Sequence, residues 1–221
     1  PDLYFDAFHK ISQSTNDSKE PKIDKKYRQF LYFGAANYKS EVYLNGRKLG
    51  THIGGFTPFQ FEITEFLKEK DNFLIVKVDN KREKNAVPTL NTDWWNYGGI
   101  TRDVKIVETP AAYISNYEIR LSPFDKNKIK GRVELDCEKC ANKTVELNIP
   151  DLGIKKSFEV NAAGICEFEV KTRKIKYWSP DSPQLYQVEI RAGEDVVRDK
   201  IGFRTIETSG SEILLNGRKI F

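Results

Sequence analysis

The sequence lacks several features that would mark particular classes of protein. Its 221 residues include no methionine, only two histidines and only three cysteines. No apolar run approaches the roughly 20 residues that a helix needs to cross a bilayer. The net charge is only +4, and Lys and Arg are interspersed with Asp and Glu rather than massed. These absences argue against a membrane protein and against a nucleic-acid-binding protein, whose basic residues would form a patch or stripe.

The cysteines and histidines do not form a metal-ligand pattern. Cys137 and Cys140 make one C-x-x-C pair without a second pair, and His9 and His52 lie far from it in the sequence. A structural zinc site usually needs four such ligands, so we expect no metal and no cofactor. Cys137 and Cys166 fall on the apolar phase of alternating segments, which predicts that both are small core residues.

The first residue is Pro1, and the chain begins in the middle of a pattern of apolar and polar residues, with neither an initiating methionine nor a signal peptide. This start indicates a fragment of a longer protein, so the terminus does not identify the compartment. The cysteines are compatible with the bacterial periplasm. A periplasmic or extracellular location is slightly favoured over the cytoplasm.

Apolar and polar residues alternate through most of the chain, as in "PFQFEIT" at residues 58–64. This period of two is typical of β-strands with one buried face. Similar segments recur at intervals of about ten residues, a spacing typical of β-sandwiches. Only Thr64 to Lys70 has a helical pattern. The sequence therefore predicts an all-β fold.

The strand pattern predicts two domains and a final hairpin. The boundary is placed near Thr109-Pro110, because the roughly 95 residues that follow have the size of one immunoglobulin-like sandwich. We expect a first domain over residues 1–109, a sandwich over 110–207 and a hairpin over 208–221. The hairpin begins after the sandwich is complete, which predicts a further domain beyond Phe221.

Two Asn-Gly pairs lie between apolar runs, at Asn45-Gly46 and Asn216-Gly217. Asn-Gly favours the type I′ turn of a tight hairpin, in which both central residues have positive φ. The motif "LNGRK" occurs at both places. We interpret it as two turns of the same type rather than as an internal repeat.

The segment "NTDWWNYGGITRD" (91–103) places two of the three tryptophans beside Asp93 and before Gly98-Gly99. A flat aromatic face next to a carboxylate suits a sugar ring, whose hydroxyls need an acceptor. The same residues would also suit ordinary core packing beside a turn. The segment alone leaves both interpretations open.

Several segments together resemble glycoside hydrolase family 2, the family of β-galactosidases, β-glucuronidases and β-mannosidases. They are "SEVYLNGRKLGTHIGGFTPFQFEIT" (40–64), "NYGGITRDV" (96–104), "YWSPDSPQLYQVEI" (177–190), "IGFRTIE" (201–207) and "LLNGRKIF" (214–221). The resemblance covers about residues 27–221. It implies a sugar-binding jelly roll that looks short at its start, an immunoglobulin-like β-sandwich and the lead-in hairpin of a catalytic TIM barrel.

The family resemblance implies where the chemistry lies. Retaining glycosidases use two carboxyl groups, and in this family both are glutamates on the barrel. We therefore expect no catalytic residue in this fragment and no hydrolysis by it alone. Its parent is expected to be a β-galactosidase or, as the second choice, a β-glucuronidase. The expected partners are a carbohydrate substrate and the barrel domain, and the family often forms homo-oligomers through such β domains.

The resemblance also implies a sugar-contacting loop. It assigns to Asp93 the carboxylate that accepts hydrogen bonds from sugar hydroxyls. Trp94 and Trp95 either offer a face to the sugar or pack under the loop as anchors, and Asn91 and Asn96 are candidates for the rim of the pocket.

Nearby residues receive structural interpretations. Gly98 and Gly99 are expected to permit a turn or a close backbone approach. Arg102 and Asp103 are predicted to form an ion pair. Phe56 is expected either to pack in the core, which is the default, or to face a ligand. Trp178 is predicted to fill the core of the second sandwich. Four glutamates occupy the polar positions of alternating strands and are interpreted as lying on solvent-exposed strand faces: Glu41, Glu62, Glu134 and Glu189.

Two other functions compete with a family 2 fragment. One is a free-standing carbohydrate-binding or adhesion module, and the other is a purely structural surface sandwich. A self-contained module would end with its last sandwich strand, whereas "LLNGRKIF" begins another element. We therefore favour the family 2 fragment.

Overall fold

The computed structural model describes residues 5–10, 26–87, 89–122, 125–172 and 175–220. Nearly all regular structure in these residues is β-strand, with one 3₁₀ turn, η1 (Pro150–Leu152), so the all-β prediction is confirmed. The helical pattern at Thr64 to Lys70 corresponds to a single turn, in which the Leu67 amide donates to the Ile63 carbonyl at 3.1 Å. Beyond that turn, the Asn72 side chain binds both the amide (2.8 Å) and the carbonyl (2.7 Å) of Lys68.

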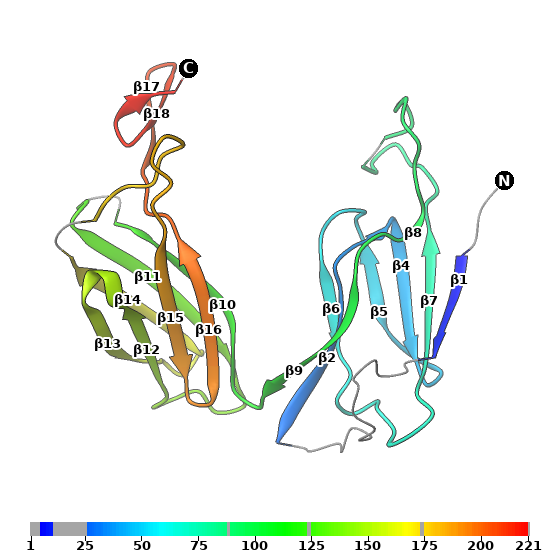
Figure 1. The fold of residues 1–221 in the computed structure, drawn as a ribbon. Coiled ribbons are helices and arrows are strands. Elements are labelled where there is room, and N and C mark those ends of the chain that lie inside the picture. Colours follow the sequence, from blue (N-terminus) through cyan, green and yellow to red (C-terminus); the bar gives the residue numbers. More distant parts are fainter. Residues whose placement is uncertain (1–4, 11–25, 88, 123–124, 173–174, 221) are drawn as a thin grey trace. The chain divides into compact units, whose positions relative to one another are not determined.

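The chain divides into two compact units between Thr109 and Pro110. Unit 1 contains a sheet of order β1-β7-β4-β5, a sheet of order β6-β2-β9 and the short pair β3-β8 (Figure 1). Its strands are β1 (Phe5–Lys10), β2 (Tyr27–Phe33), β3 (Ala36–Asn37), β4 (Lys39–Leu44), β5 (Arg47–Ile53), β6 (Phe59–Glu62), β7 (Phe73–Asp79), β8 (Gly99–Ile100) and β9 (Val104–Pro110).

The core of unit 1 joins its two larger sheets. Alternate residues of β4 and β7 point inward and meet Leu31 and Phe33 of β2. The buried cluster consists of Leu31, Phe33, Val42, Leu44, Ile63, Leu74, Val76 and Val78. Because β7 contributes three of these residues, the strand that leads into the Asp93 segment is firmly anchored.

Both Asn-Gly turns form as predicted. Asn45 and Gly46 have φ of 52° and 82°, and Asn216 and Gly217 have φ of 53° and 79°. Positive φ at both central residues is the signature of the type I′ turn. The side-chain amide of Asn45 also donates to the Phe66 carbonyl at 2.8 Å and so ties its turn to the neighbouring loop.

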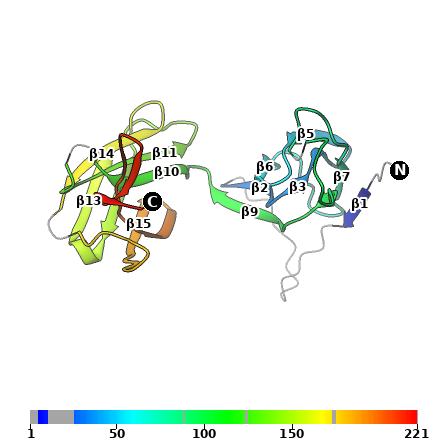
Figure 2. The ribbon, with the colours of Figure 1, turned by 90° about the horizontal axis from the view of Figure 1, so that it is seen from above.

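Unit 2 is a β-sandwich followed by a small sheet. One antiparallel layer has the order β10-β11-β14 and the other β13-β12-β15-β16, and the view in Figure 2 separates them. This pairing fits an immunoglobulin-like sandwich. The strands are β10 (Tyr113–Leu121), β11 (Lys128–Asp136), β12 (Thr144–Ile149), β13 (Ile154–Glu159), β14 (Ile165–Lys171), β15 (Tyr186–Ala192) and β16 (Asp195–Ile201). The last sheet contains β17 (Ile206–Ser209), β18 (Glu212–Leu215) and β19 (Arg218–Lys219).

The cysteines of unit 2 differ in part from the prediction. Cys166 is fully buried in the sandwich core, as expected. Cys137 lies just after β11, is partly buried and packs against the core, but it also forms a disulfide with Cys140 that the sequence did not predict. The two residues are close because the chain turns directly after the strand ends.

Trp178 does not fill the sandwich core as predicted. Its half-buried ring packs on Gly202, where a Cβ atom would come within 2.9 Å of the indole, and the Arg204 guanidinium lies 5.3 Å from the ring centre. The Trp178 carbonyl accepts a hydrogen bond from the Asn216 amide at 3.0 Å. Trp178 therefore connects the end of the sandwich to the β17–β19 sheet.

Candidate functional site

The Asp93 segment, defined as residues 91–98, is the last part of the connection from β7 to β8 and lies beyond the end of β7 (Figure 1). Two glycines allow its return to the sheet. Gly99 has a φ of 96°, and Gly98 lies so close to Asn80 that a Cβ atom would be 2.7 Å from the Asn80 Cγ. Both glycines thus have the turn and close-approach roles that the sequence predicts.

Three asparagines hold the C-terminal part of this segment. The Asn80 amide donates to the Asn96 carbonyl (2.9 Å), and the Asn96 amide donates to the Asn80 carbonyl (2.7 Å). The buried Asn37 amide donates to the Asn96 side-chain oxygen (2.8 Å) and to the Tyr97 carbonyl (2.6 Å). Asn96, predicted at the pocket rim, therefore has a structural role in the loop.

Arg82 holds the N-terminal part of the segment. Its Nη1 atom donates to the Thr92 carbonyl at 3.0 Å, and its Nη2 atom donates to the Trp94 carbonyl at 2.7 Å. One guanidinium thus binds the residues on either side of Asp93. The sequence pattern did not identify Arg82, because nothing in the spacing of residues 82 and 92–94 signals a contact.

The side chains that the segment displays are exposed. Within the described residues the exposed Asp93 carboxylate makes no hydrogen bond or ion pair. Trp94 and Trp95 are 63% and 82% exposed, which excludes the anchor role that would place them under the loop. Tyr97, which the sequence pattern did not indicate as a site residue, is 75% exposed and joins them. Asn91 is also exposed and fits its assignment to the rim.

A second loop lies beside this one. Asn37 contacts Asn96 and Tyr97, and its side-chain oxygen is close enough to Gly55 that a Cβ atom there would come within 2.5 Å. The neighbouring Phe56 is 60% exposed, so its predicted core position is wrong. Two adjacent loops of unit 1 therefore present aromatic side chains to solvent.

The predicted Arg102–Asp103 ion pair is replaced by other contacts. The Arg102 guanidinium donates to the Phe56 carbonyl at 3.4 Å, and the Asp103 carboxylate pairs with Lys105 at 3.2 Å. In an extended strand, residues 103 and 105 share a face whereas 102 and 103 do not. This geometry explains the exchange of partners.

The four strand-face glutamates form surface ion pairs, in agreement with the solvated interpretation. Glu62 pairs with Arg28 (2.7 Å), and Glu134 pairs with Arg132 (2.9 Å). Hydrogen bonding to Lys48 lowers the pKa of Glu41. Burial raises the pKa of Glu189, but Arg191 and Arg198 lower it by more. A glycosidase acid needs a raised pKa, so neither Glu41 nor Glu189 suits that role.

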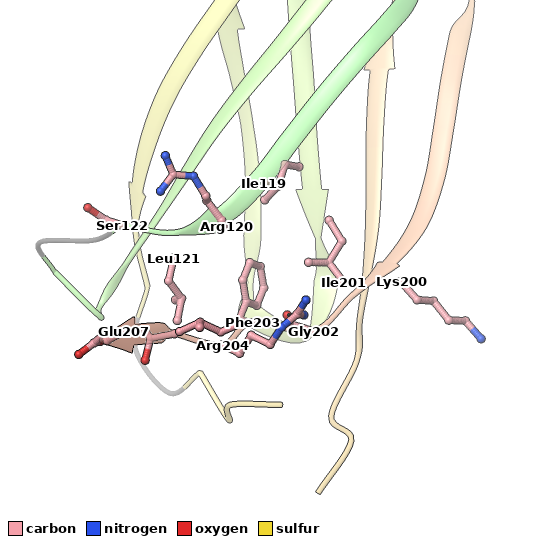
Figure 3. A pocket seen from close by; sticks show the side chains of 12 residues that line it. Ile119, Arg120, Leu121, Ser122, Lys200, Ile201, Gly202, Phe203, Arg204 and Glu207 are labelled. Carbon is pink, nitrogen blue, oxygen red and sulfur yellow. Dashed lines mark hydrogen bonds between the residues drawn. The ribbon is translucent and has the colours of Figure 1, made fainter. Parts of the chain in front are cut away.

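Unit 2 contains a pocket of about 580 Å³ where the sandwich meets its last sheet (Figure 3). Apolar side chains, among them Ile119, Leu121 and Phe203, line its inner part. Among the described residues that line it, Glu207 alone carries a carboxylate. The pocket contains no predicted site residue, and it lacks the pair of carboxyl groups that glycoside cleavage requires.

The described part of the chain shows no group of three or more His, Cys, Asp or Glu side chains able to hold a metal ion. Those residues also contain no helix with the length and hydropathy of a membrane span.

Family comparisons match both units in order along the chain. The model described as "Glycosyl hydrolases family 2, sugar binding domain" matches residues 11–110, and the model described as "Glycosyl hydrolases family 2" matches residues 112–204. The chain belongs to glycoside hydrolase family 2. The resemblance seen in the sequence is thereby confirmed, together with the jelly-roll and immunoglobulin-like fold classes.

Individual relatives within family 2 agree with this assignment. A β-galactosidase of Streptococcus thermophilus is 31% identical over 202 residues, which cover 86% of this chain. A β-galactosidase of Thermoanaerobacterium thermosulfurigenes is 30% identical across the whole chain. The structure of a Bifidobacterium dentium β-glucuronidase, complexed with coumarin-3-O-glucuronide, matches 98% of the chain with 25% identity and a TM-score of 0.81.

The chain spans only part of each of these family 2 proteins. It covers 19% of the S. thermophilus protein, 34% of the T. thermosulfurigenes protein and 41% of the B. dentium chain.

Proposed function

We propose that this chain is the non-catalytic N-terminal portion of a retaining glycoside hydrolase that acts on terminal β-glycosides. It supplies β-sheet scaffold and part of the rim of the substrate pocket. The two glutamates that break the bond belong to polypeptide outside residues 1–221. Family membership and the small share of each relative that the chain covers support this division of roles.

The observation that carries the proposal is the state of Asp93. Its carboxylate is exposed and unpaired within the described residues, while the backbone on both sides of it is held by Arg82. An ionised carboxylate makes strong hydrogen bonds and accepts two hydroxyls at once. The geometry therefore suits a fixed acceptor for sugar hydroxyls, beside the exposed faces of Trp94 and Trp95.

β-Galactosides are the substrate class that we propose first, with β-glucuronides second. The sequence relatives include proteins named β-galactosidase and proteins named "putative β-glucuronidase", and the structural relative is a β-glucuronidase. The order of preference follows the sequence-based expectation. Assays of the full-length gene product with aryl β-galactoside, β-glucuronide and β-mannoside rank the three classes. We also propose that the full-length protein forms a homo-oligomer, which light scattering tests.

The role of Asp93 is tested in the full-length gene product. Asp93→Asn should lower kcat/KM by about 100-fold, as expected when a charged hydrogen bond of about 2–3 kcal/mol is lost. Asp103→Asn is the matched control, since Asp103 is also an exposed aspartate and its carboxylate pairs with Lys105. Wild-type kinetics in the Asp93→Asn variant would remove Asp93 from the substrate site.

A free-standing carbohydrate-binding module is the second candidate, favoured by the exposure of Trp94 and Trp95. Calorimetric titration of residues 1–221 with galactose, glucuronate and mannose separates the two functions. Binding at millimolar or lower concentration would favour the module. The rim of an incomplete pocket should give no signal.

A further inference from the structure

The contacts of Arg82 form a fork that spans Asp93. Its two terminal nitrogens bind the carbonyls of Thr92 and Trp94 at 3.0 and 2.7 Å. Asn80, two residues earlier, binds the Asn96 carbonyl at 2.9 Å. Three alternate carbonyls of the segment therefore accept hydrogen bonds from residues 80–82.

These side chains are important because the segment has little backbone support of its own. Among the described residues, no amide of residues 92–97 donates a hydrogen bond to another backbone group. Loops with few backbone hydrogen bonds move readily unless side chains tie them down. The conformation of the backbone at Asp93 thus depends on the Arg82 fork.

The base of the fork is rigid. β7 ends at Asp79 and contributes Leu74, Val76 and Val78 to the buried core. Just beyond the strand, the Asp79 carboxylate accepts a hydrogen bond from the Lys81 amide at 2.9 Å and fixes the turn that presents Arg82. Core packing is therefore transmitted through the turn and the fork to the Asp93 segment.

We propose that Arg82 is a positioning residue, whose guanidinium fork fixes the backbone on both sides of Asp93 and so pre-organises the Asp93 carboxylate for sugar hydroxyls. This assignment rests on the proposed function of Asp93. A guanidinium offers several N–H donors in one rigid plane, whereas a lysine ammonium is a point charge on a flexible stem. Only arginine can hold both carbonyls in this fixed geometry.

The first test measures backbone order in residues 1–221 and involves no sugar. The NMR order parameters of the backbone amides of residues 92–97 should be about 0.85 in the wild-type chain and should fall below about 0.6 in Arg82→Met. Arg82→Lys keeps the charge but not the fork, so it should show a similar loss. Lys84→Met is the matched control, because exposed Lys84 makes no such contact in the described residues.

Order parameters that remain at the wild-type value in Arg82→Met would overturn the positioning role. Full recovery of order in Arg82→Lys would overturn the requirement for a fork. Either result stands whether or not the chain binds a sugar.

The second test uses kcat/KM of the full-length gene product in a double-mutant cycle. Arg82→Met should lower kcat/KM about 10-fold in the wild-type background and much less in the Asp93→Asn background, because coupled residues are not additive. An equal loss in both backgrounds would show that Arg82 does not act through Asp93. If Asp93→Asn itself leaves kcat/KM unchanged, the proposed function fails, whereas the NMR result tests the Arg82 fork separately.

Discussion

At the residue scale, the side chains in and around the Asp93 segment divide into two groups. Asn37, Asn80 and Arg82 hold backbone carbonyls and lie outside the segment itself. Asp93 and the neighbouring tryptophans are exposed and hold nothing in the described residues. The first group determines the shape of the loop, and the second is available to a ligand.

Gly98 tests how tightly the segment is packed. A Cβ atom at Gly98 would lie 2.7–2.9 Å from the Asn80 side chain, so Gly98→Ala should displace Asn80 and break its pair with Asn96. We expect a loss of about 1–3 kcal/mol in the free energy of unfolding of unit 1, which is typical of overpacking. Urea titration measures this loss.

Asn80→Ala supplies the control for this prediction. It removes the group that the new methyl would meet, so Gly98→Ala should cost much less in the Asn80→Ala background. Additive losses in the double variant would contradict the steric explanation.

The role of a single residue in the candidate site was predictable only where its residue type has one main structural role. Gly98 and Gly99 were assigned correctly, since few other residues tolerate a positive φ or so close an approach. The core position predicted for Phe56 was wrong, because the residue type alone does not reveal its burial. The structural bonds of Asn96 were not predictable either, because an asparagine serves a loop as readily as a ligand. The Arg82 fork depends on a contact across ten residues and required the three-dimensional structure.

At the element scale, side-chain bonds connect the two sheets of the unit 2 sandwich. The Tyr117 hydroxyl on β10 donates to the Asp199 carboxylate on β16 at 2.7 Å. The Ile114 amide on β10 donates to the Asp195 carboxylate on β16 at 2.7 Å. Both bonds join strands of different sheets, so they fix the packing of one layer on the other.

The Tyr117 bond predicts a pH dependence. Burial, together with the hydrogen bond to Asp199, raises the pKa of Tyr117 to about 12, from an ordinary value near 10. The folded state therefore keeps this proton at a pH where the unfolded chain has lost it. Its contribution to stability is complete below pH 10 and is lost as the pH rises from 10 to 12.

Tyr117→Phe removes this contribution. Between pH 10 and 12 the free energy of unfolding of unit 2 should fall less steeply in the variant than in the wild-type chain, as measured by denaturant titration at each pH. Equal slopes for the two proteins would show that Tyr117 titrates with an ordinary pKa.

Elements with a strong period of two and a turn signal were predictable. The alternating segments became strands, and both Asn-Gly pairs became type I′ turns, because both patterns are local. The helical pattern at Thr64 to Lys70 gives one turn and no more, because the Asn72 side chain binds the backbone of Lys68. The Cys137–Cys140 disulfide was missed because the turn after β11, rather than the spacing alone, brings the two residues together.

At the scale of the whole molecule, each unit has its own hydrophobic core, and the candidate site lies in unit 1 alone. The order of five short segments was enough to predict the family, because each is a local sequence motif and their order along the chain is specific. The sugar was not predictable, since the exposed side chains of the Asp93 segment would suit more than one β-glycoside. Residues that distinguish these sugars are expected in the catalytic part of the protein.

The central claim is that residues 1–221 provide scaffold and a substrate rim, and that bond cleavage is performed by other polypeptide. The most direct measurement compares hydrolysis of an aryl β-galactoside and an aryl β-glucuronide by purified residues 1–221 and by the full-length gene product. We expect turnover from the full-length protein and none above the buffer rate from residues 1–221. Turnover that copurifies with residues 1–221 and scales with their concentration would contradict the claim.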